Sequence, residues 1–246
     1  MSSSTWGNSL RRATFLAMER WIRNASLVGD SKFFAPDRFS WVAPLEADHH
    51  LMRVELDRLL THREALPNFQ DVSPDQEHIT RDDLWKTYFL YFYGRRVAAN
   101  CKRCPQTDRL LQTIPGMRTA FFSILLPGKE IPLHRGPYNG VLRYHLGLKI
   151  PQPPQSCGIV VGGERASWSE GKSLIFDDTY LHRAWNLSRD LRAILFVDFC
   201  RPLPLAAAFL NRLYINYISM TPFVRTLLAR QQAWTATLDA IYREYD

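Results

Sequence analysis

The segment between residues 118 and 202 constrains the fold most, because its apolar residues recur with a period of two and not with a helical period. Pro-Gly, Asn-Gly and Gly-Gly pairs separate the apolar runs, and such pairs are typical of hairpin turns. Many short strands joined by hairpins favour a double-sheet jelly roll or a barrel. The predicted strands cover residues 118–126, 141–150, 158–161, 165–168, 173–177, 183–186 and 191–200.

Helical patterns flank this segment on both sides. Thr80 is a suitable N-cap, with Asp83 three residues later in an arrangement similar to a capping box, and an aromatic-rich run follows as far as Tyr93. We therefore predict a core helix over residues 80–93. Further predicted helices cover residues 8–24, 45–66, 105–113 and 205–217, and a last one begins at Pro222.

The whole chain is expected to form one domain, because 246 residues can bury one sizeable core and no linker or repeat interrupts the pattern. The predicted fold class is an all-β core with helical flanks. Its parts would be a helical N-terminal part at residues 1–117, a jelly-roll core at 118–202 and C-terminal helices at 203–246.

The basic composition narrows the range of partners. A net charge of +7 suits anionic substrates or anionic membrane surfaces, although a solvated basic surface would give the same balance. Lysines and arginines are scattered and no nucleic-acid motif accompanies them, so we expect no nucleic-acid partner.

Residues 8–24 combine apolar residues at helical spacing with arginines between them, which makes them a candidate for peripheral membrane contact. The alternative is that this helix packs on its own domain. Residues 1–7 are polar and lack the apolar core of a secretion signal. We therefore expect a cytoplasmic location, with peripheral contact to a membrane if residues 8–24 bind one.

Two histidines stand at the edges of predicted strands. His134 lies in the turn before the strand at 141–150, and His182 follows the strand at 173–177. A third, His145, lies on the strand between them. The two outer histidines can meet only if the sheet folds back on itself. Histidine pairs that leave open coordination positions suit non-haem Fe(II), whereas a single histidine is more often a structural residue.

Arginines accompany these histidines. Arg143 shares a strand face with His145, so this face either meets water or lines an interior pocket that holds a carboxylate. Arg192 opens a strongly apolar strand, and a buried arginine is costly unless an anion pairs with it. That anion could be Asp198, on the same strand face, or a small dicarboxylate.

Four motifs stand out when they are taken together: His134-Arg135-Gly136-Pro137-Tyr138-Asn139, Leu142-Arg143-Tyr144-His145-Leu146-Gly147-Leu148, Phe176-Asp177-Asp178-Thr179-Tyr180-Leu181-His182, and Arg192. With these motifs the chain resembles the aspartyl/asparaginyl β-hydroxylase family. The match covers residues 118–204 well, and upstream the chain is more loosely similar to the lipid A hydroxylase branch, at residues 91–94 and 101–105. The resemblance implies an Fe(II)- and 2-oxoglutarate-dependent dioxygenase on a double-stranded β-helix.

The resemblance also implies roles for single residues. His134 and His182 would bind the iron. Ser123 and Arg192 would bind the distal carboxylate of 2-oxoglutarate, and Arg143 and His145 its metal-proximal end. The family reaction consumes O₂ and 2-oxoglutarate, releases succinate and CO₂, and hydroxylates an unactivated C–H bond, with the protein supplying placement and electrostatics.

Gly136 bears on which class of substrate the protein acts on. A facial triad would place a carboxylate two residues after the first histidine, where glycine offers no side-chain ligand. The aspartyl/asparaginyl hydroxylases resemble this chain there, which favours a peptidyl or amino-acid substrate. The upstream similarity favours acyl-chain hydroxylation at a membrane surface, and an inactive binding domain is the third reading. Four cations that flank the site would suit either substrate: Lys129, Arg135, Arg183 and Arg189.

Overall fold

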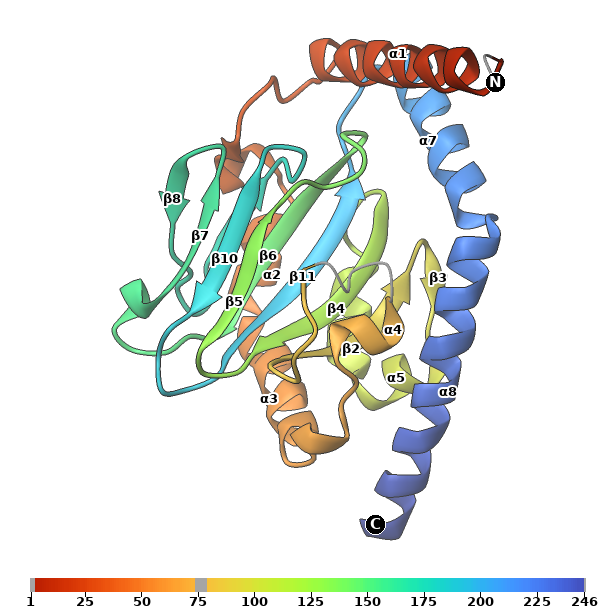
Figure 1. The fold of residues 1–246 in the computed structure, drawn as a ribbon. Helices are drawn as coiled ribbons and strands as arrows, with labels where there is room; N and C mark the ends of the chain where they lie inside the picture. Colours follow the sequence, from red (N-terminus) through yellow and green to blue (C-terminus); the bar gives the residue numbers. More distant parts are fainter. Residues whose placement is uncertain (1–2, 74–78, 246) are drawn as a thin grey trace.

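The computed structural model describes residues 3–73 and 79–245, and it contains two antiparallel β-sheets with helices around them (Figure 1). This arrangement is a double-stranded β-helix, which confirms the predicted fold class. The larger sheet has the order β1 (Phe33–Phe34), β9 (Ser173–Phe176), β6 (Val141–Lys149), β11 (Arg192–Cys200), β4 (Met117–Leu125), β2 (Trp85–Phe92) and β3 (Arg95–Arg96). The smaller sheet has the order β5 (Lys129–His134), β10 (His182–Asn186), β7 (Cys157–Val161) and β8 (Glu164–Ala166).

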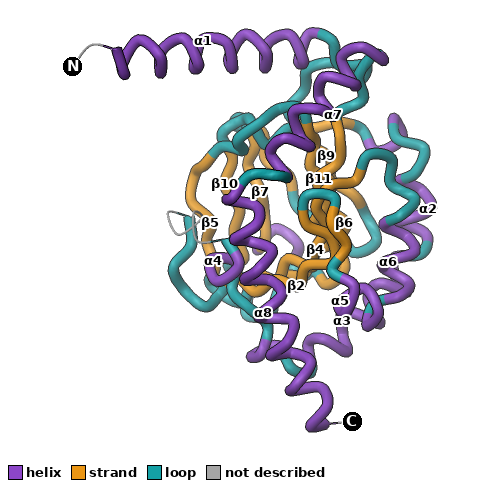
Figure 2. The backbone as a smooth tube through the Cα atoms, turned by 90° about the vertical axis from the view of Figure 1, so that its right-hand side faces the viewer, coloured by secondary structure: helices purple, strands orange, loops and turns teal. Residues whose placement is uncertain are grey.

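The helices lie outside the sheets. In Figure 1, α1 crosses one end of the sandwich, and α7 continues into α8 along one side. Figure 2 shows α7 and α8 in front of the strands, with α2, α3, α5 and α6 on another side. The helices are α1 (Ser3–Asn24), α2 (Val42–Ala47), α3 (His49–Leu60), α4 (Phe69–Val72), α5 (Ala98–Arg103), α6 (Pro105–Leu111), α7 (Leu205–Ser219) and α8 (Pro222–Tyr245).

The period-two pattern located all seven strands predicted between residues 118 and 202, each within one or two residues at most of its ends. It missed β5, which ends at His134. This strand lies at the edge of the smaller sheet and contains Pro132, a residue that edge strands tolerate because one side of the backbone has no partner strand. His134 is therefore the last residue of a strand and not part of a turn.

The predicted helix over residues 80–93 is wrong. Residues 85–92 form β2, whose eight residues are all buried and which pairs with β4 on one side and β3 on the other. The three- and four-residue spacing of its aromatic residues suited a helix by coincidence, whereas a continuous apolar run is also typical of a strand covered on both faces. The larger sheet therefore extends upstream of residue 118, the expected start of the β core.

The flanking helices follow the prediction more closely. The segment predicted as one helix over residues 45–66 forms α2 and α3, which are separated at Asp48. Among the described residues, no helix is long and apolar enough to cross a membrane.

The two faces of the larger sheet bury different cores. Alternate residues of β6, such as Leu142 and Tyr144, pack with α2 and α3 in one core. The other face, with Phe121, Ile194 and Phe196, packs toward the smaller sheet. Five polar residues of the motifs line this second interior, between the sheets: His134, Arg143, His145, His182 and Arg192.

Candidate active site

His134 and His182 meet across the smaller sheet. They are direct partners in the pairing of β5 with β10, and their ring centroids are 4.0 Å apart. Strand pairing therefore brings together two side chains that are 48 positions apart in the sequence.

Backbone carbonyls orient both rings. Nδ1 of His134 lies 2.8 Å from the carbonyl oxygen of Pro132, and Nδ1 of His182 lies 2.9 Å from that of Tyr180. If each Nδ1 donates its hydrogen, each Nε2 carries the lone pair, which is the usual state of a metal-binding imidazole. Burial, followed by the proximity of His134 and Arg143, lowers the pKa of His182 to about 3, so this ring is neutral near pH 7.

A cavity adjoins the histidine pair and holds about 380 Å³ of empty space, part of it open to solvent. All six residues predicted for the site line it. Ser123 comes from β4, His145 from β6 and Arg192 from β11, three strands that lie side by side in the larger sheet. The six residues are Ser123, His134, Arg143, His145, His182 and Arg192.

Several buried polar atoms in this cavity have no hydrogen-bond partner among the described residues. They are both ring nitrogens of His145, Nε of Arg192 and Nε1 of Trp168. Arg192 stacks 4.6 Å from the Trp168 ring, its Nη1 donates weakly to the Ser123 carbonyl at 3.4 Å, and burial lowers its pKa. Unsatisfied buried polar atoms call for an explanation, and a bound carboxylate would accept hydrogen bonds from the N–H donors among them.

Ser123 faces the same cavity with its hydroxyl already oriented. Nε1 of Trp85 donates to the Ser123 hydroxyl oxygen at 3.0 Å, so the hydroxyl hydrogen remains available to an acceptor. Trp85, Trp168 and Phe196 line the cavity but were not predicted as site residues. Phe196 could have been predicted, because it shares a strand face with Arg192. Trp85 could not, because its segment was interpreted as a helix and forms β2 instead.

Arg143 is held by two carboxylates at the cavity wall. Its Nη2 lies 2.8 Å from Asp178 and its Nε lies 3.0 Å from Asp198. Burial lowers the pKa of Arg143, but these two carboxylates raise it more. Asp198 therefore pairs with Arg143, and the suggestion that it is the anion for Arg192 is wrong, because the two arginines sit on adjacent strands and Asp198 lies opposite Arg143.

Gly136, two residues after the first histidine, leaves room for the Asp178 carboxylate. A β-carbon at position 136 would overlap the Asp178 carboxylate, and the amide of Gly136 donates to the Asp178 carbonyl at 2.7 Å. Burial raises the pKa of Asp178 to about 6, although Arg143 opposes the shift. Among the described residues, no group of three or more His, Cys, Asp or Glu side chains is arranged to hold a metal ion.

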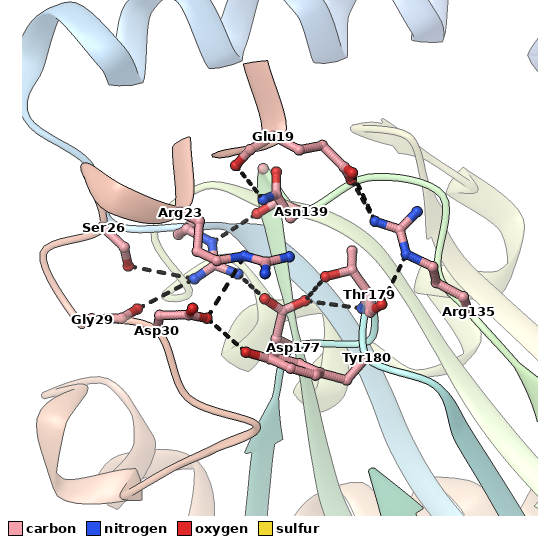
Figure 3. A network of polar contacts seen from close by, with 12 residues as sticks. Glu19, Arg23, Ser26, Gly29, Asp30, Arg135, Asn139, Asp177, Thr179 and Tyr180 are labelled. Carbon is pink, nitrogen blue, oxygen red and sulfur yellow. Dashed lines mark hydrogen bonds and ion pairs between the residues drawn. The ribbon is translucent and has the colours of Figure 1, made fainter. Parts of the chain in front are cut away.

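A polar network connects α1 to both segments that carry a histidine (Figure 3). Glu19 of α1 accepts two hydrogen bonds from Arg135 at 2.9 and 2.8 Å, and its carbonyl accepts one from Asn139. Arg135 also donates to the carbonyl of Thr179, next to Asp178. Deeper in the network, Arg201 and Asp177 form a fully buried ion pair.

Of the four cations expected to flank the site, Lys129 has a different role. It is buried, and its Nζ donates to Thr80 at 2.7 Å and to Asp82 at 2.9 Å. Arg183 and Arg189 are exposed, as a solvated surface would require.

A second, larger cavity opens beside the first. It encloses about 1280 Å³ of empty space, part of it open to solvent, and shares Arg143 and Phe196 with the first cavity. Its walls are mostly apolar and come from the larger sheet, α4, α7, α8 and Phe15 of α1. Six aromatic residues from the sheet, the turn after β2 and α4 line it: Phe69, Phe89, Phe92, Tyr93, Phe121 and Phe196.

Known proteins resemble this chain in sequence. A relative named ornithine lipid ester-linked acyl 2-hydroxylase, from Rhizobium tropici, is 42% identical over 89% of this chain and 80% of its own length. Aspartate beta-hydroxylase domain-containing protein 2 of Xenopus tropicalis is 35% identical over 74% of this chain and 54% of its own length. The human aspartyl/asparaginyl beta-hydroxylase is 38% identical over 52% of this chain, which spans only 17% of that protein.

Solved structures resemble the chain more distantly. A Cupin_2 domain of a transcriptional regulator from Enterobacter cloacae is 14% identical, with a TM-score of 0.33, over 48% of this chain and 97% of that domain. By contrast, the family model described as aspartyl/asparaginyl beta-hydroxylase matches residues 46–202. The chain therefore belongs to the aspartyl/asparaginyl β-hydroxylase family, whose named members include hydroxylases.

Proposed function

We propose that the protein is an Fe(II)- and 2-oxoglutarate-dependent hydroxylase that acts on an acyl chain of a lipid. The observation that carries the proposal is the wall of Arg143 and Phe196, which the histidine cavity shares with a large apolar cavity. A substrate chain in the apolar cavity would end at this shared wall, on the other side of which the two imidazoles lie. The name of the relative from Rhizobium tropici, an acyl 2-hydroxylase, supports the same substrate class.

The donor set suits a non-haem iron. His134 and His182 would hold it, since their rings converge and their Nδ1 atoms are engaged by carbonyls. When iron, 2-oxoglutarate and O₂ are bound, their chemistry converts 2-oxoglutarate to succinate and CO₂ and adds one oxygen atom to a C–H bond of the substrate.

The chain's own residues would place the co-substrate. The Arg192 guanidinium would pair with the distal carboxylate and the Ser123 hydroxyl would donate to it, since both face the cavity from adjacent strands. His145 would contact the other end through its unsatisfied nitrogens. Arg143 already holds two carboxylates, so any contact with the co-substrate would be made by a guanidinium fixed in position.

A peptidyl or amino-acid substrate is the second candidate. Gly136 favours it, because the family's aspartyl/asparaginyl hydroxylases resemble the chain at that position. The lining of the large cavity favours the lipid, because its aromatic and aliphatic side chains would bury a hydrocarbon chain and leave a peptide backbone without hydrogen bonds.

The test is an incubation of the purified protein with Fe(II), 2-oxoglutarate and O₂, with separate lipid and peptide pools. Mass spectrometry should find an added oxygen on lipid acyl chains, together with succinate. Oxygen on peptides alone would replace the lipid by the second candidate. No substrate-dependent succinate with either pool, from protein that binds iron, would support an inactive binding domain.

A further inference from the structure

The outer face of α7 exposes a continuous apolar surface. Leu205 is 92% exposed and Phe209 is 63% exposed, values that are unusual for large apolar side chains on one short helix. The positions recur at helical spacing, so the side chains lie along one side of the helix. We call this set the α7 outer face: Leu205, Phe209, Leu210, Leu213, Tyr217 and Met220.

The opposite face of α7 is already occupied. Ala207, Asn211 and Ile215 are buried, and Asn211 accepts a hydrogen bond from Tyr138 and donates to the Gly140 carbonyl. Ile215 and Ile218 line the large apolar cavity. The helix is therefore anchored to its own domain by one face, and the outer face needs a different partner.

The charged residues of the segment that carries the outer face are all positive. Residues 203–238 contain three arginines and no aspartate or glutamate. Arg212 is exposed at the edge of the outer face and lines an open depression together with Arg118 and Asn216. Arg118 also lines the large cavity, so positive charge lies between that cavity and the surface of α7.

We propose that the α7 outer face docks the protein on the surface of an anionic lipid bilayer. Apolar side chains of the face would enter the boundary between headgroups and acyl chains, and Arg212 and Arg118 would meet anionic headgroups. A second copy of this chain would also cover apolar surface, but symmetric pairing through α7 would bring the same arginines together. An anionic bilayer neutralises them instead.

The site of docking differs from the segment that the sequence suggested. Residues 8–24 were the candidate for membrane contact, and Leu16 and Trp21 of α1 are indeed exposed. Contact through α1 stays a prediction. The stronger surface is on α7, where five large apolar residues are exposed on the helix and a sixth, Met220, is exposed at its C-cap.

The first test is sedimentation of the full chain with vesicles of phosphatidylcholine and phosphatidylglycerol at a ratio of about 7 to 3. The double variant Phe209→Gln/Leu213→Gln should bind at least about tenfold more weakly than the wild type, because it removes apolar area that would enter the bilayer. Arg212→Gln should weaken binding to these vesicles and leave binding to pure phosphatidylcholine unchanged. The matched control is Val54→Gln/Leu187→Gln, which changes two equally exposed apolar residues outside α7 and should bind like the wild type.

A second measurement does not depend on the stability of the glutamine variants. An environment-sensitive dye on Leu213→Cys should shift to the blue when vesicles are added, whereas the same dye on Val54→Cys should not, with labelled wild type as the background. Equal shifts at both positions, or equal binding of the wild type and the Phe209→Gln/Leu213→Gln variant, would overturn the proposal. A wild type that ignores vesicles but forms dimers, which the double variant loses, would identify a second copy as the partner.

Docking and catalysis can fail separately. The idea that a lipid acyl chain passes from the bilayer into the cavity rests on the proposed function. The docking proposal itself rests only on the exposed residues of α7 and its surroundings. The Phe209→Gln/Leu213→Gln variant should keep wild-type hydroxylation of a detergent-dispersed lipid and lose it on vesicles. Vesicle binding without any lipid hydroxylation would support docking and contradict the proposed function. Lipid hydroxylation on vesicles that the variant leaves unchanged would support the proposed function and contradict docking through α7.

Discussion

Gly136 and Asp178 pack so closely that a β-carbon at position 136 would overlap the Asp178 carboxylate. The glycine stands two residues after His134, and Asp178 stands four residues before His182. In a facial triad, a carboxylate side chain would extend from position 136. Here the Asp178 carboxylate, from the segment that carries His182, occupies the space next to that position. That carboxylate is bound by Arg143, which also separates the two cavities.

This packing makes a prediction about coupling. Gly136→Ala should lower the free energy of unfolding by about 1–3 kcal/mol, because the added carbon forces Asp178 or the backbone to move. In the double variant Gly136→Ala/Asp178→Ala the overlap is absent, so its loss should be smaller than the sum of the single losses. Denaturant unfolding of the four proteins measures the difference, and strictly additive losses would show that the two residues do not interact.

Removal of either histidine should remove the iron. His134→Ala and His182→Ala should each retain close to no Fe(II) after anaerobic dialysis, because one imidazole is left to hold the ion. Metal analysis of the dialysed protein measures the retained iron. His50→Ala, which removes an exposed histidine of α3, should bind iron like the wild type. Full iron retention by both site variants would place the metal elsewhere.

Arg192 should control the affinity for 2-oxoglutarate. Arg192→Met keeps much of the volume but removes a charge-assisted pair of about 1.5–3 kcal/mol, which corresponds to about 10- to 150-fold weaker binding. Arg192→Lys should lose less, since it keeps the charge but not the planar fork. Anaerobic calorimetric titration of the iron-loaded proteins measures the affinity. Arg189→Ala is the control on the nearby surface, and an unchanged affinity in Arg192→Met would remove Arg192 from the co-substrate site.

The buried imidazole of His145 should make the stability of the metal-free protein depend on pH. Burial, with nearby Arg143, Arg192 and His182, lowers its pKa well below 6.5 in the folded state. The unfolded chain therefore binds a proton below about pH 6.5 that the folded chain does not, and stability falls by up to about 1.4 kcal/mol per pH unit for this group.

Urea unfolding of chelator-treated protein between pH 7.5 and 5 tests this dependence. His145→Gln should lose less stability than the wild type over that range, since it lacks the group that protonates on unfolding. The exposed His50→Gln should follow the wild-type curve. Parallel curves for the wild type and His145→Gln would mean that His145 is not held neutral in the folded state.

Glu19 should hold α1 against the two histidine-bearing segments. Glu19→Gln removes the carboxylate that accepts two hydrogen bonds from Arg135, so hydrogen exchange should rise in α1 and in residues 135–139. The control is Glu164→Gln, which breaks an exposed ion pair with Lys32 and should change exchange only locally. Unchanged exchange in Glu19→Gln would show that the apolar contacts of α1 suffice to hold it.

The sequence by itself determined the strands of the β core and the residues that face its interior. The period of two is a local property, so Leu142 and Tyr144 could be placed on one face of a strand and Arg143 and His145 on the other. It also predicted six candidate site residues as a set, through the resemblance to one family. The structure brings all six to one cavity.

Only the tertiary structure decided what those residues meet. Residues 85–92 form a strand because both of their faces are covered by distant parts of the chain, which a local aromatic spacing cannot reveal. Asp198 pairs with Arg143 and not with Arg192 because β6 and β11 are neighbours in a particular register. The exposure of the α7 outer face was also decided by the tertiary structure. Both sides of α7 carry apolar residues, and contacts with residues far apart in the sequence determine which side is buried.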